Sequence, residues 1–273
     1  MATNLMISYP RIPQDALTIT SSQTEDEDYQ VYNLIGGPRH HLFQTSAAAA
    51  SLDLTFDLGI GTDGAEDTDT VDHVIIGRAD LLQSGGVTSV ALKSSDDNFT
   101  ASTTEQTFSD FDITTLRGPR EFDFISTFTE TSAHRYWRLS YTATSTKFPH
   151  SFAYFGKAFD FGDEPNAITL NIKDRVEKTV TSKSGKEWYL RTMEPMYEIQ
   201  VTWRGITDSV VNDFMDRIGS RWNKFPIYLY TTSSHDILEG YRLMCCKFKA
   251  APVTRQIYDD YNEVSLSLME AIG

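Results

Sequence analysis

The stretch that decides the fold is LDLTFDLG, from Leu52 to Gly59. Apolar and polar residues alternate along it, and successive side chains of a β-strand point to opposite faces of the sheet. One face would carry Leu52, Leu54, Phe56 and Leu58, and the other would carry Asp53, Thr55 and Asp57. A strand with one apolar face is typical of an antiparallel sheet that covers a core on one side. We therefore predict that this strand is part of a β-sandwich.

Short segments of the same kind recur after this strand. They read DHVIIGR (72–78), VTSVALKSS (87–95), FDFISTF (122–128) and RYWRLSYTA (135–143). Several short strands separated by turn residues indicate an antiparallel sandwich or barrel. We predict that residues 1–157 form this unit.

The segment SAHRYWRLSYTATS, from Ser132 to Ser145, contains a tryptophan that could face either a ligand or the core. In a strand, Trp137 shares a face with Leu139 and Tyr141, and Arg138 lies on the other face. A large aromatic ring on an apolar face usually packs inward. We therefore predict that Trp137 belongs to the inner wall of the sandwich.

Residues 158–273 show a different pattern. Five segments are typical of strands, namely NAITLNI, YEIQVTWRG, FPIYLYTT, GYRLMCCKFKA and YNEVSLSLMEA. Between the second and the third, one helical face would carry Val211, Phe214, Met215, Ile218 and Trp222. Thr207 or Asp208 is placed to cap this helix. We predict a second antiparallel β-sandwich with one α-helix, whose apolar stripe packs on the core.

The segment KTVTSKSGKEWYL (178–190) has a Ser-Lys-Ser-Gly turn between two polar arms. This pattern predicts a long hairpin that projects from the body. Such a hairpin has few core contacts of its own, so we expect another subunit to cover it.

The charge also changes between the two predicted domains: residues 1–157 contain 10 basic and 21 acidic residues, and residues 158–273 contain 14 basic and 17 acidic residues.

The composition limits the class of protein. The chain has 273 residues, of which 40 % are hydrophobic, enough for two buried cores. Its formal net charge of −14 argues against nucleic acid as a partner, because such binding needs clustered Lys and Arg. We expect no membrane span and no secretory leader, since neither a long apolar run nor a basic, apolar start is present. The adjacent Cys245 and Cys246 are predicted to be reduced core residues.

Catalytic motifs are missing from the sequence. No HExxH, GxSxG or Walker-type pattern occurs, and we predict that the protein is not an enzyme and needs no cofactor. A glycosidase would need two carboxylates about 5 to 9 Å apart. The acidic candidates for that alternative are Glu177, Glu187, Glu194 and Glu198. In strands these residues would lie on the solvent face.

The acidic segment GTDGAEDTDTVDH (61–73) offers oxygen ligands for calcium. The candidate ligands are Asp63, Asp67 and Asp69, with Glu66 and Asp72 beside them. Their spacing differs from that of an EF-hand, and acidic loops between strands are usually solvated turns. A calcium-binding loop therefore remains an alternative to a solvated turn that binds no ion.

The first half resembles the discoidin-like (galactose-binding-like) jelly rolls. The order of motifs carries the resemblance over about residues 25–145: an early loop, VYNLIGGPRHHLFQTS, then LDLTFDLG, VDHVIIGRADLL, VALKSSDDNFT and RYWRLSYT. The resemblance implies a jelly-roll sandwich whose end loops bind glycans. The residues in such loops would be His40, His41, Phe43, Asp97, Asn98 and Arg117.

Residues 160–273 are similar in layout to tail-tube and distal-tail proteins of long-tailed phages, in ITLNI, WRGITDSVVNDFMDRI, FPIYLYT and VSLSLMEA. The resemblance implies a structural protein at the tail tip or baseplate, synthesised in the bacterial cytoplasm and located in the virion. It would form a ring of three or six copies and contact the tail tube, hub and fibres. The alternative is a glycan-binding module that recognises the host surface. In distal-tail proteins the carbohydrate-binding-like domain usually follows the ring-forming one, whereas here the sandwich comes first.

Overall fold

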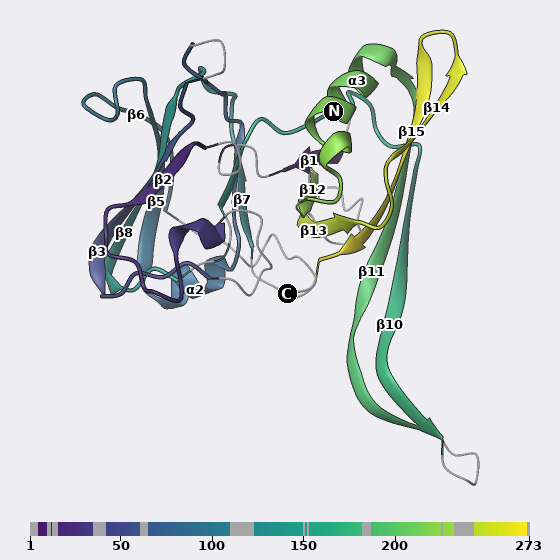
Figure 1. Cartoon of the computed structure of the whole chain (residues 1–273), viewed down its shortest axis with the longest axis horizontal. Coiled ribbons are helices and arrows are strands. Elements are labelled where there is room, and N and C mark those ends of the chain that lie inside the picture. Colours follow the sequence, from purple (N-terminus) through teal and green to yellow (C-terminus); the bar gives the residue numbers. More distant parts are fainter. Residues whose placement is uncertain are drawn as a thin grey trace.

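The computed structural model describes residues 5–9, 12, 16–34, 42–60, 65–109, 123–149, 151, 153–181, 187–224, 226–231 and 243–271. Two bodies lie side by side, and a long two-stranded hairpin extends from one of them (Figure 1). The chain is mainly β-structure, and every strand pairing described is antiparallel. The predicted class of a mainly β protein with antiparallel sheets is therefore confirmed.

The first body is a sandwich of two sheets. A five-stranded sheet has the order β2 (Thr18–Ser21), β3 (Ala49–Asp57), β8 (Tyr136–Thr146), β5 (Val87–Ser95) and β6 (Thr103–Phe108). A three-stranded sheet has the order β7 (Phe124–Thr127), β4 (His73–Ile76) and β9 (Ala153–Gly156). A short helix α2 (Ala79–Ser84) and a 3-10 turn η1 (Val31–Leu34) complete this body.

The sandwich core confirms the alternation predicted for β3 and β8. Leu52, Leu54 and Phe56 are fully buried, as are Trp137 and Leu139. Phe56 of one sheet meets Phe155 of the other edge to face, with 5.0 Å between ring centroids. Trp137 is thus part of the inner wall.

The second body is a single seven-stranded sheet. Its order is β1 (Leu5–Ser8), β12 (Ile227–Thr231), β13 (Leu243–Phe248), β15 (Tyr261–Glu270), β11 (Glu187–Thr207) and β10 (Ala167–Thr181), with β14 (Val253–Tyr258) paired to β15. Among the described residues, the layer packed against this sheet consists of α3 (Asp208–Arg217), the 3-10 turn η2 (Gly219–Arg221), Phe159 and Phe161. A second sheet was predicted at this place, and one helix covers the sheet instead.

The predicted helix and hairpin are both present. Thr207 is the residue before α3, and Val211, Phe214 and Ile218 are buried on its apolar face. Phe214 packs on Phe161, whose ring lies 4.3 Å from that of Trp203 in β11. Strands β10 and β11 pair from Ala167 and Thr202 out to Thr181 and Glu187, and Figure 1 shows them extending beyond the body.

The N-terminal strand β1 belongs to the second body, which differs from the predicted division into domains 1–157 and 158–273. Residues 5–8 pair with β12 in the seven-stranded sheet, and Ile7 also exchanges two 2.9 Å backbone hydrogen bonds with Phe159. The pattern in LMIS is too short to show which sheet the strand joins. The sandwich strands β2 to β9 are therefore inserted in the chain between β1 and β10.

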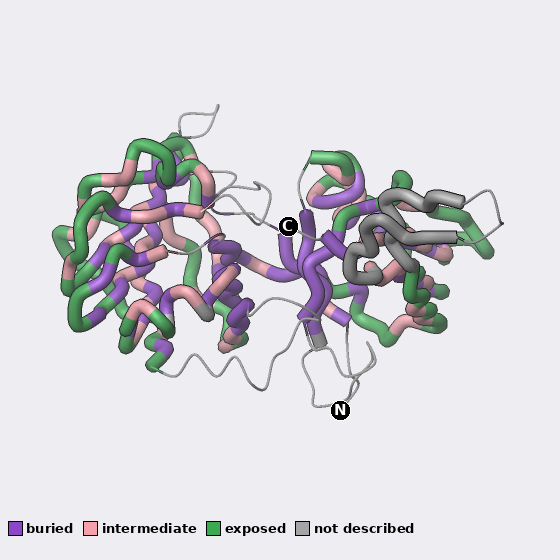
Figure 2. The backbone as a smooth tube through the Cα atoms, turned by 90° about the horizontal axis from the view of Figure 1, so that it is seen from below, coloured by how far each residue is buried: buried purple, intermediate pink, exposed green. Residues whose placement is uncertain are grey.

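A buried layer joins the two bodies. Strand β4 is buried along its whole length, because Val74 and Ile76 pack in the sandwich while Ile75 packs toward the second sheet. Ile75 lies in one apolar cluster with Tyr154, Tyr228 and Cys245. Figure 2 shows buried backbone running between the two bodies.

The cysteines behave as predicted. Neither Cys245 nor Cys246 forms a disulfide, and both are buried. They belong to apolar clusters on opposite faces of β13, Cys245 at the junction between the bodies and Cys246 in the core of the second body. None of the helices described is both long and apolar enough to span a membrane.

Candidate functional site

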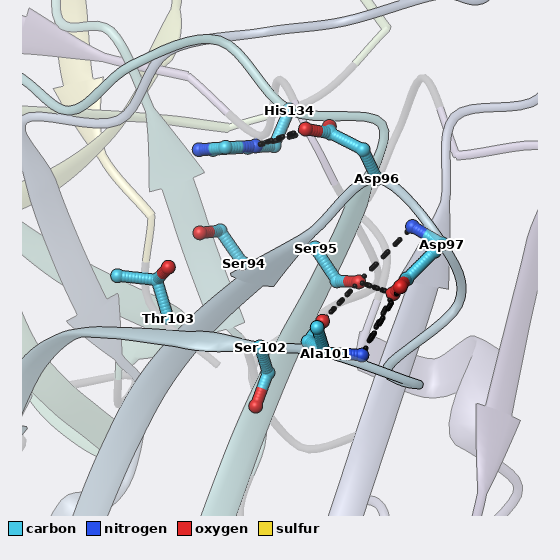
Figure 3. Close-up of a pocket in the computed structure, with 8 residues that line it drawn as sticks. All are labelled: Ser94, Ser95, Asp96, Asp97, Ala101, Ser102, Thr103 and His134. Carbon is cyan, nitrogen blue, oxygen red and sulfur yellow. Dashed lines mark hydrogen bonds and ion pairs between the residues drawn. The ribbon is translucent and has the colours of Figure 1, made fainter.

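A pocket of about 330 Å³, lined mainly by residues with polar side chains, opens at one end of the sandwich. It lies between the β5–β6 hairpin and the segment that leads into β8, and Figure 3 shows its lining. The lining residues are Ser94, Ser95, Asp96, Asp97, Ala101, Ser102, Thr103 and His134. Carboxylates, hydroxyls and one imidazole thus surround the same space.

Asp97 holds the turn on one side of this pocket. Its carboxylate accepts hydrogen bonds from the Ala101 N–H, at 3.0 and 3.2 Å, and from the Ser95 hydroxyl, at 2.7 Å. These bonds from Ala101 and Ser95 lower the pKa of Asp97 below its ordinary value. Asn98 and Phe99 follow with positive φ angles of 54° and 66°. The Ser-x-Asp motif is therefore explained by the turn that it stabilises.

His134 lies on the opposite side of the pocket, with its ring between two acidic residues. Its Nδ1 is 3.0 and 3.1 Å from the two oxygens of Asp96, and its Nε2 is 3.9 Å from Oε1 of Glu105 (Figure 3 shows the Asp96 contact). The Ser94 hydroxyl donates a hydrogen bond to the same Glu105 oxygen. Side chains from β5, from β6 and from the segment that leads into β8 therefore converge here.

The backbone of His134 is fixed by its neighbours. It exchanges two hydrogen bonds with Asp69, of 3.0 and 3.2 Å, and its carbonyl also accepts the indole N–H of Trp137 at 3.0 Å. The His134 ring contacts the Trp137 ring edge to face, with 5.9 Å between centroids. The buried tryptophan thus positions the histidine at the pocket.

A salt-bridge network supports the same end of the sandwich. Arg135 donates to both oxygens of Asp57, at 2.8 and 3.2 Å, and to Glu66 at 3.0 Å. Burial raises the pKa of Asp57, but the bonds from Arg135 and from the Gly59 N–H outweigh burial and lower it. The paired carboxylates raise the pKa of Arg135 in turn. This network ties the Asp-Leu-Gly motif to the start of β8.

The predicted ligand residues that the structure describes do not form one site. Phe43 is fully buried in the sandwich core, so its ring is not available to a ligand, and this prediction is corrected. The segment that contains Phe43 lies at the C-terminal end of β8, where the Thr45 N–H donates a hydrogen bond to the Lys147 carbonyl. Asp97 lies near the other end of β8, because it comes two residues after Ser95, which pairs with Tyr136. Ten residues of strand separate these ends, which is roughly 33 Å. His40, His41 and Arg117 lie outside the described residues.

The predicted calcium ligands are only partly described. Asp63 lies outside the described residues, and Asp69 accepts a hydrogen bond from the Thr70 N–H. Within the ranges that the structure describes, no three His, Cys, Asp or Glu side chains converge in a way that could hold a metal. The calcium site stays a prediction.

Glu198 does not support the alternative that the protein is a glycosidase. Its carboxylate binds Lys173 at 2.9 Å and Lys249 at 3.1 Å, and these bonds lower its pKa. The side chains of Glu177, Glu187 and Glu194 lie outside those that the structure describes.

The comparisons with known proteins find no match among family models or curated proteins. Among solved structures, chitosan-binding module 2 of a Paenibacillus sp. IK-5 chitosanase/glucanase, in complex with chitotriose, has a TM-score of 0.40 at 14 % identity. That match covers 54 % of this chain and 100 % of the module.

Two further structures are similar. A family 32 carbohydrate-binding module from C. perfringens, in complex with galactose, has a TM-score of 0.39 at 13 % identity, over 57 % of this chain and 99 % of the module. A Ruminococcus gnavus GH29 fucosidase in complex with fucose has a TM-score of 0.42 at 15 % identity, over 55 % of this chain and 27 % of the fucosidase. Likenesses of this size assign neither a family nor a ligand to the chain.

Proposed function

We propose that this protein is a non-catalytic structural subunit of a multi-subunit assembly, at the tip or baseplate of a phage tail. The observation that carries the proposal is the hairpin of β10 and β11. Within the described residues, β10 pairs with β11 alone, so its outer edge has no strand beside it. Long unpaired edges usually pair or are covered in native proteins. A neighbouring subunit would supply that cover.

A second edge supports the same proposal. All six residues of β14 are exposed, and two of its apolar side chains, Val253 and Tyr258, are 60 % and 75 % exposed. On β10, Ile172 is 63 % exposed. In the described part of the chain, no further strand lies beside the outer edges of β10 and β14. Exposed apolar residues on both strands suit head-to-tail contacts that close into a ring.

The charge distribution also favours contact between copies. The segment Lys173–Arg191 contains six basic and three acidic residues, in a chain whose net charge is −14. A positively charged arm is attracted to a negatively charged neighbouring body, which favours association. We propose a ring of three or six copies within the virion tail, in contact with tail tube, hub or fibre proteins.

The assembly is tested by removing the arm without disturbing its base. Lys173 and Met196 are paired residues, so an Asn-Gly turn between them can replace residues 174–195. We expect closed rings for the full chain, and monomers of unchanged melting temperature for the shortened chain, by light scattering and negative-stain microscopy. Equal oligomeric states would contradict the role of the arm. Absence of the protein from purified phage particles by mass spectrometry would contradict the location.

Glycan binding by the sandwich is the second candidate function. The pocket favours it, because Asp96, His134 and several hydroxyls offer donors and acceptors for sugar hydroxyls. A glycan array probed with the full chain and with Asp96→Ala tests this candidate. Signals that Asp96→Ala abolishes would support it, and no signal from the full chain would remove it while leaving the assembly role intact.

A further inference from the structure

We infer that the acidic turn of one copy, residues Asp26–Tyr29, docks in an arginine-lined groove on the second body of another copy. The inference rests on the proposed self-assembly and names one of the contacts that would build it. It depends on the charges in the groove, on the geometry of the turn and on the tyrosines beside both surfaces.

The arginine groove lies at the edge of the seven-stranded sheet where β14 pairs with β15. It has a volume of about 270 Å³ and is lined by Arg204, Arg255, Gln256, Ile257 and Glu263. Glu263 of β15 is paired with Arg204 of β11 on one side and with Arg255 of β14 on the other. An acidic residue thus lies between two arginines in a row across three strands.

The charges in this row are not balanced. Glu263 accepts a hydrogen bond from Nε of Arg204 at 2.6 Å. Arg255 is exposed and forms no ion pair with any residue that the structure describes. The N–H donors of its guanidinium group are therefore available to a carboxylate from outside, and arginine binds carboxylates through two parallel hydrogen bonds.

A second row of the same kind lies further along this face of the sheet. Glu198 of β11 binds Lys173 at 2.9 Å and Lys249 at 3.1 Å. Because an even number of residues separates Glu198 from Arg204 in the strand, both side chains lie on the same face. Each row has an excess of positive charge, in a chain whose formal net charge is −14. An acidic surface of another copy is therefore attracted to this face.

The hairpin turn itself is acidic, with Asp259 and Asp260 between β14 and β15. Asp259 follows Arg255 by four residues, which is roughly 13 Å along an extended strand. A carboxylate that approaches over the face of the sheet therefore meets Arg255 before it meets the like charges of the turn.

The acidic turn on the sandwich presents two carboxylates at its corner. The Tyr29 N–H donates a hydrogen bond to the Asp26 carbonyl at 3.1 Å, and the Asp28 N–H donates one to the Asp26 carboxylate at 3.1 Å. Glu27 and Asp28 occupy the corner between them, and both are exposed. Neither forms an ion pair in the described ranges, so both are available to a cationic partner.

Tyrosines lie beside both surfaces. Tyr258 and Tyr261, next to the groove, are 75 % and 49 % exposed, and Tyr29 and Tyr32, next to the acidic turn, are 37 % and 59 % exposed. Tyrosine and arginine are enriched in protein interfaces, because both combine a large contact area with polar groups. Since exposed ion pairs alone contribute little to affinity, burial of these rings would supply the rest.

The turn and the groove can meet only between two copies. Gln44 exchanges two 3.0 Å backbone hydrogen bonds with Asp26 and Tyr29, which fix the turn to the sandwich. Strand β2, which leads into the turn, and strand β14, which borders the groove, lie on opposite sides of the molecule (Figure 1). Because the two surfaces differ, the contact is head-to-tail.

Charge reversal in the full chain tests the inference. We expect Arg255→Glu to raise the dissociation constant between copies at least roughly tenfold in sedimentation experiments, and the paired change Glu27→Lys with Asp28→Lys to do the same. When all three substitutions are combined in one chain, opposite charges face each other again. We expect the combined variant to associate within about threefold of the parent.

Lys224→Glu and Asp216→Lys are the matched controls. They reverse charges of the same signs at exposed residues outside the groove and the turn, and they should associate like the parent. Circular dichroism verifies that each variant is folded. High salt should weaken the association of the parent and of the combined variant alike.

Three results would overturn the inference while leaving the proposed assembly intact: rings that neither charge reversal weakens, weakening by Arg255→Glu alone, and no recovery in the combined variant. The second of these would mean that the groove binds a different acidic surface. Pairs or open filaments that depend on both surfaces would support this contact and contradict the closed ring. A full chain that stays monomeric at every concentration would overturn both proposals.

Discussion

Ser8 in β1 and His73 in β4 share a hydrogen bond, with 2.5 Å between Oγ and Nε2, which joins the seven-stranded sheet to the sandwich. The other ring nitrogen, Nδ1, donates to Asp72 at 2.6 Å, and Asp72 also accepts the Ala158 N–H at 3.1 Å. The order Ser–His–Asp resembles that of a hydrolase triad. However, Ser8 and His73 are 0 % and 1 % exposed, so no substrate reaches them. Their arrangement serves the junction between the bodies.

Ser8→Ala is expected to lower the free energy of unfolding by about 1–3 kcal/mol, because it leaves Nε2 of a buried histidine without its hydrogen-bond partner. Denaturant unfolding measures this loss. Ser132→Ala is the control, since Ser132 is exposed. Equal stability of the two variants would show that the junction does not depend on this bond.

Trp137→Ala is expected to cost about 3–5 kcal/mol, because it removes a fully buried ring from the sandwich core. Trp137→Phe keeps most of the apolar contact and loses the bond to the His134 carbonyl, so we expect a clearly smaller loss. Thermal and denaturant unfolding compare the two. Losses of equal size would mean that the indole N–H, rather than burial, is the main contribution.

Gly59→Ala is expected to destabilise the end of β3. Gly59 has a φ of +85°, and a Cβ there would lie 2.9 Å from Cδ2 and 3.1 Å from Cβ of Leu17. The left-handed backbone alone costs about 1–2 kcal/mol for a residue with a side chain. Gly86→Ala is the matched control, with a φ of +82° and no atom within 4 Å of the added Cβ. The difference in unfolding free energy between the variants reports the contact with Leu17, and no difference would show that Leu17 moves aside freely.

The Asp57–Arg135 pair predicts a pH-dependent stability. The folded-state pKa of Asp57 is lowered, so its contribution is complete above its ordinary pKa of about 3.9 and is lost as the pH falls through the folded value. Arg135→Gln should lower the free energy of unfolding by about 1 kcal/mol at neutral pH, since the ion pair is partly exposed. The loss should shrink in acid below about pH 4. A loss that stays constant from neutral pH into acid would contradict this assignment.

Local patterns were sufficient to predict much of the fold. The alternation in β3 and β8 is visible because each has one buried face, and the stripe of α3 has a helical period for the same reason. Strand β14 was missed because all its residues are exposed and no alternation marks it. The pairing of β1 with β12 was missed because four residues of strand hold no information about a partner so distant in the chain.

The candidate site was less accessible to sequence reasoning. Asp97 was predicted from its place after a strand, but His134 and Asp96 meet across 38 residues of chain through the pairing of β5 with β8. Phe43 was misassigned because a loop aromatic that stacks on a ligand and one that fills a core have the same sequence signature.

The insertion of the sandwich between β1 and β10 affects the order in which the protein can fold. Synthesis produces β1 first and its partner β12 only near the end of the chain. Chains fold domain by domain as they emerge from the ribosome. The sandwich can therefore form while β1 still lacks its sheet, and Ser8 can already reach His73. The finished sandwich, with the buried surface of β4, would then act as the template on which the later strands assemble.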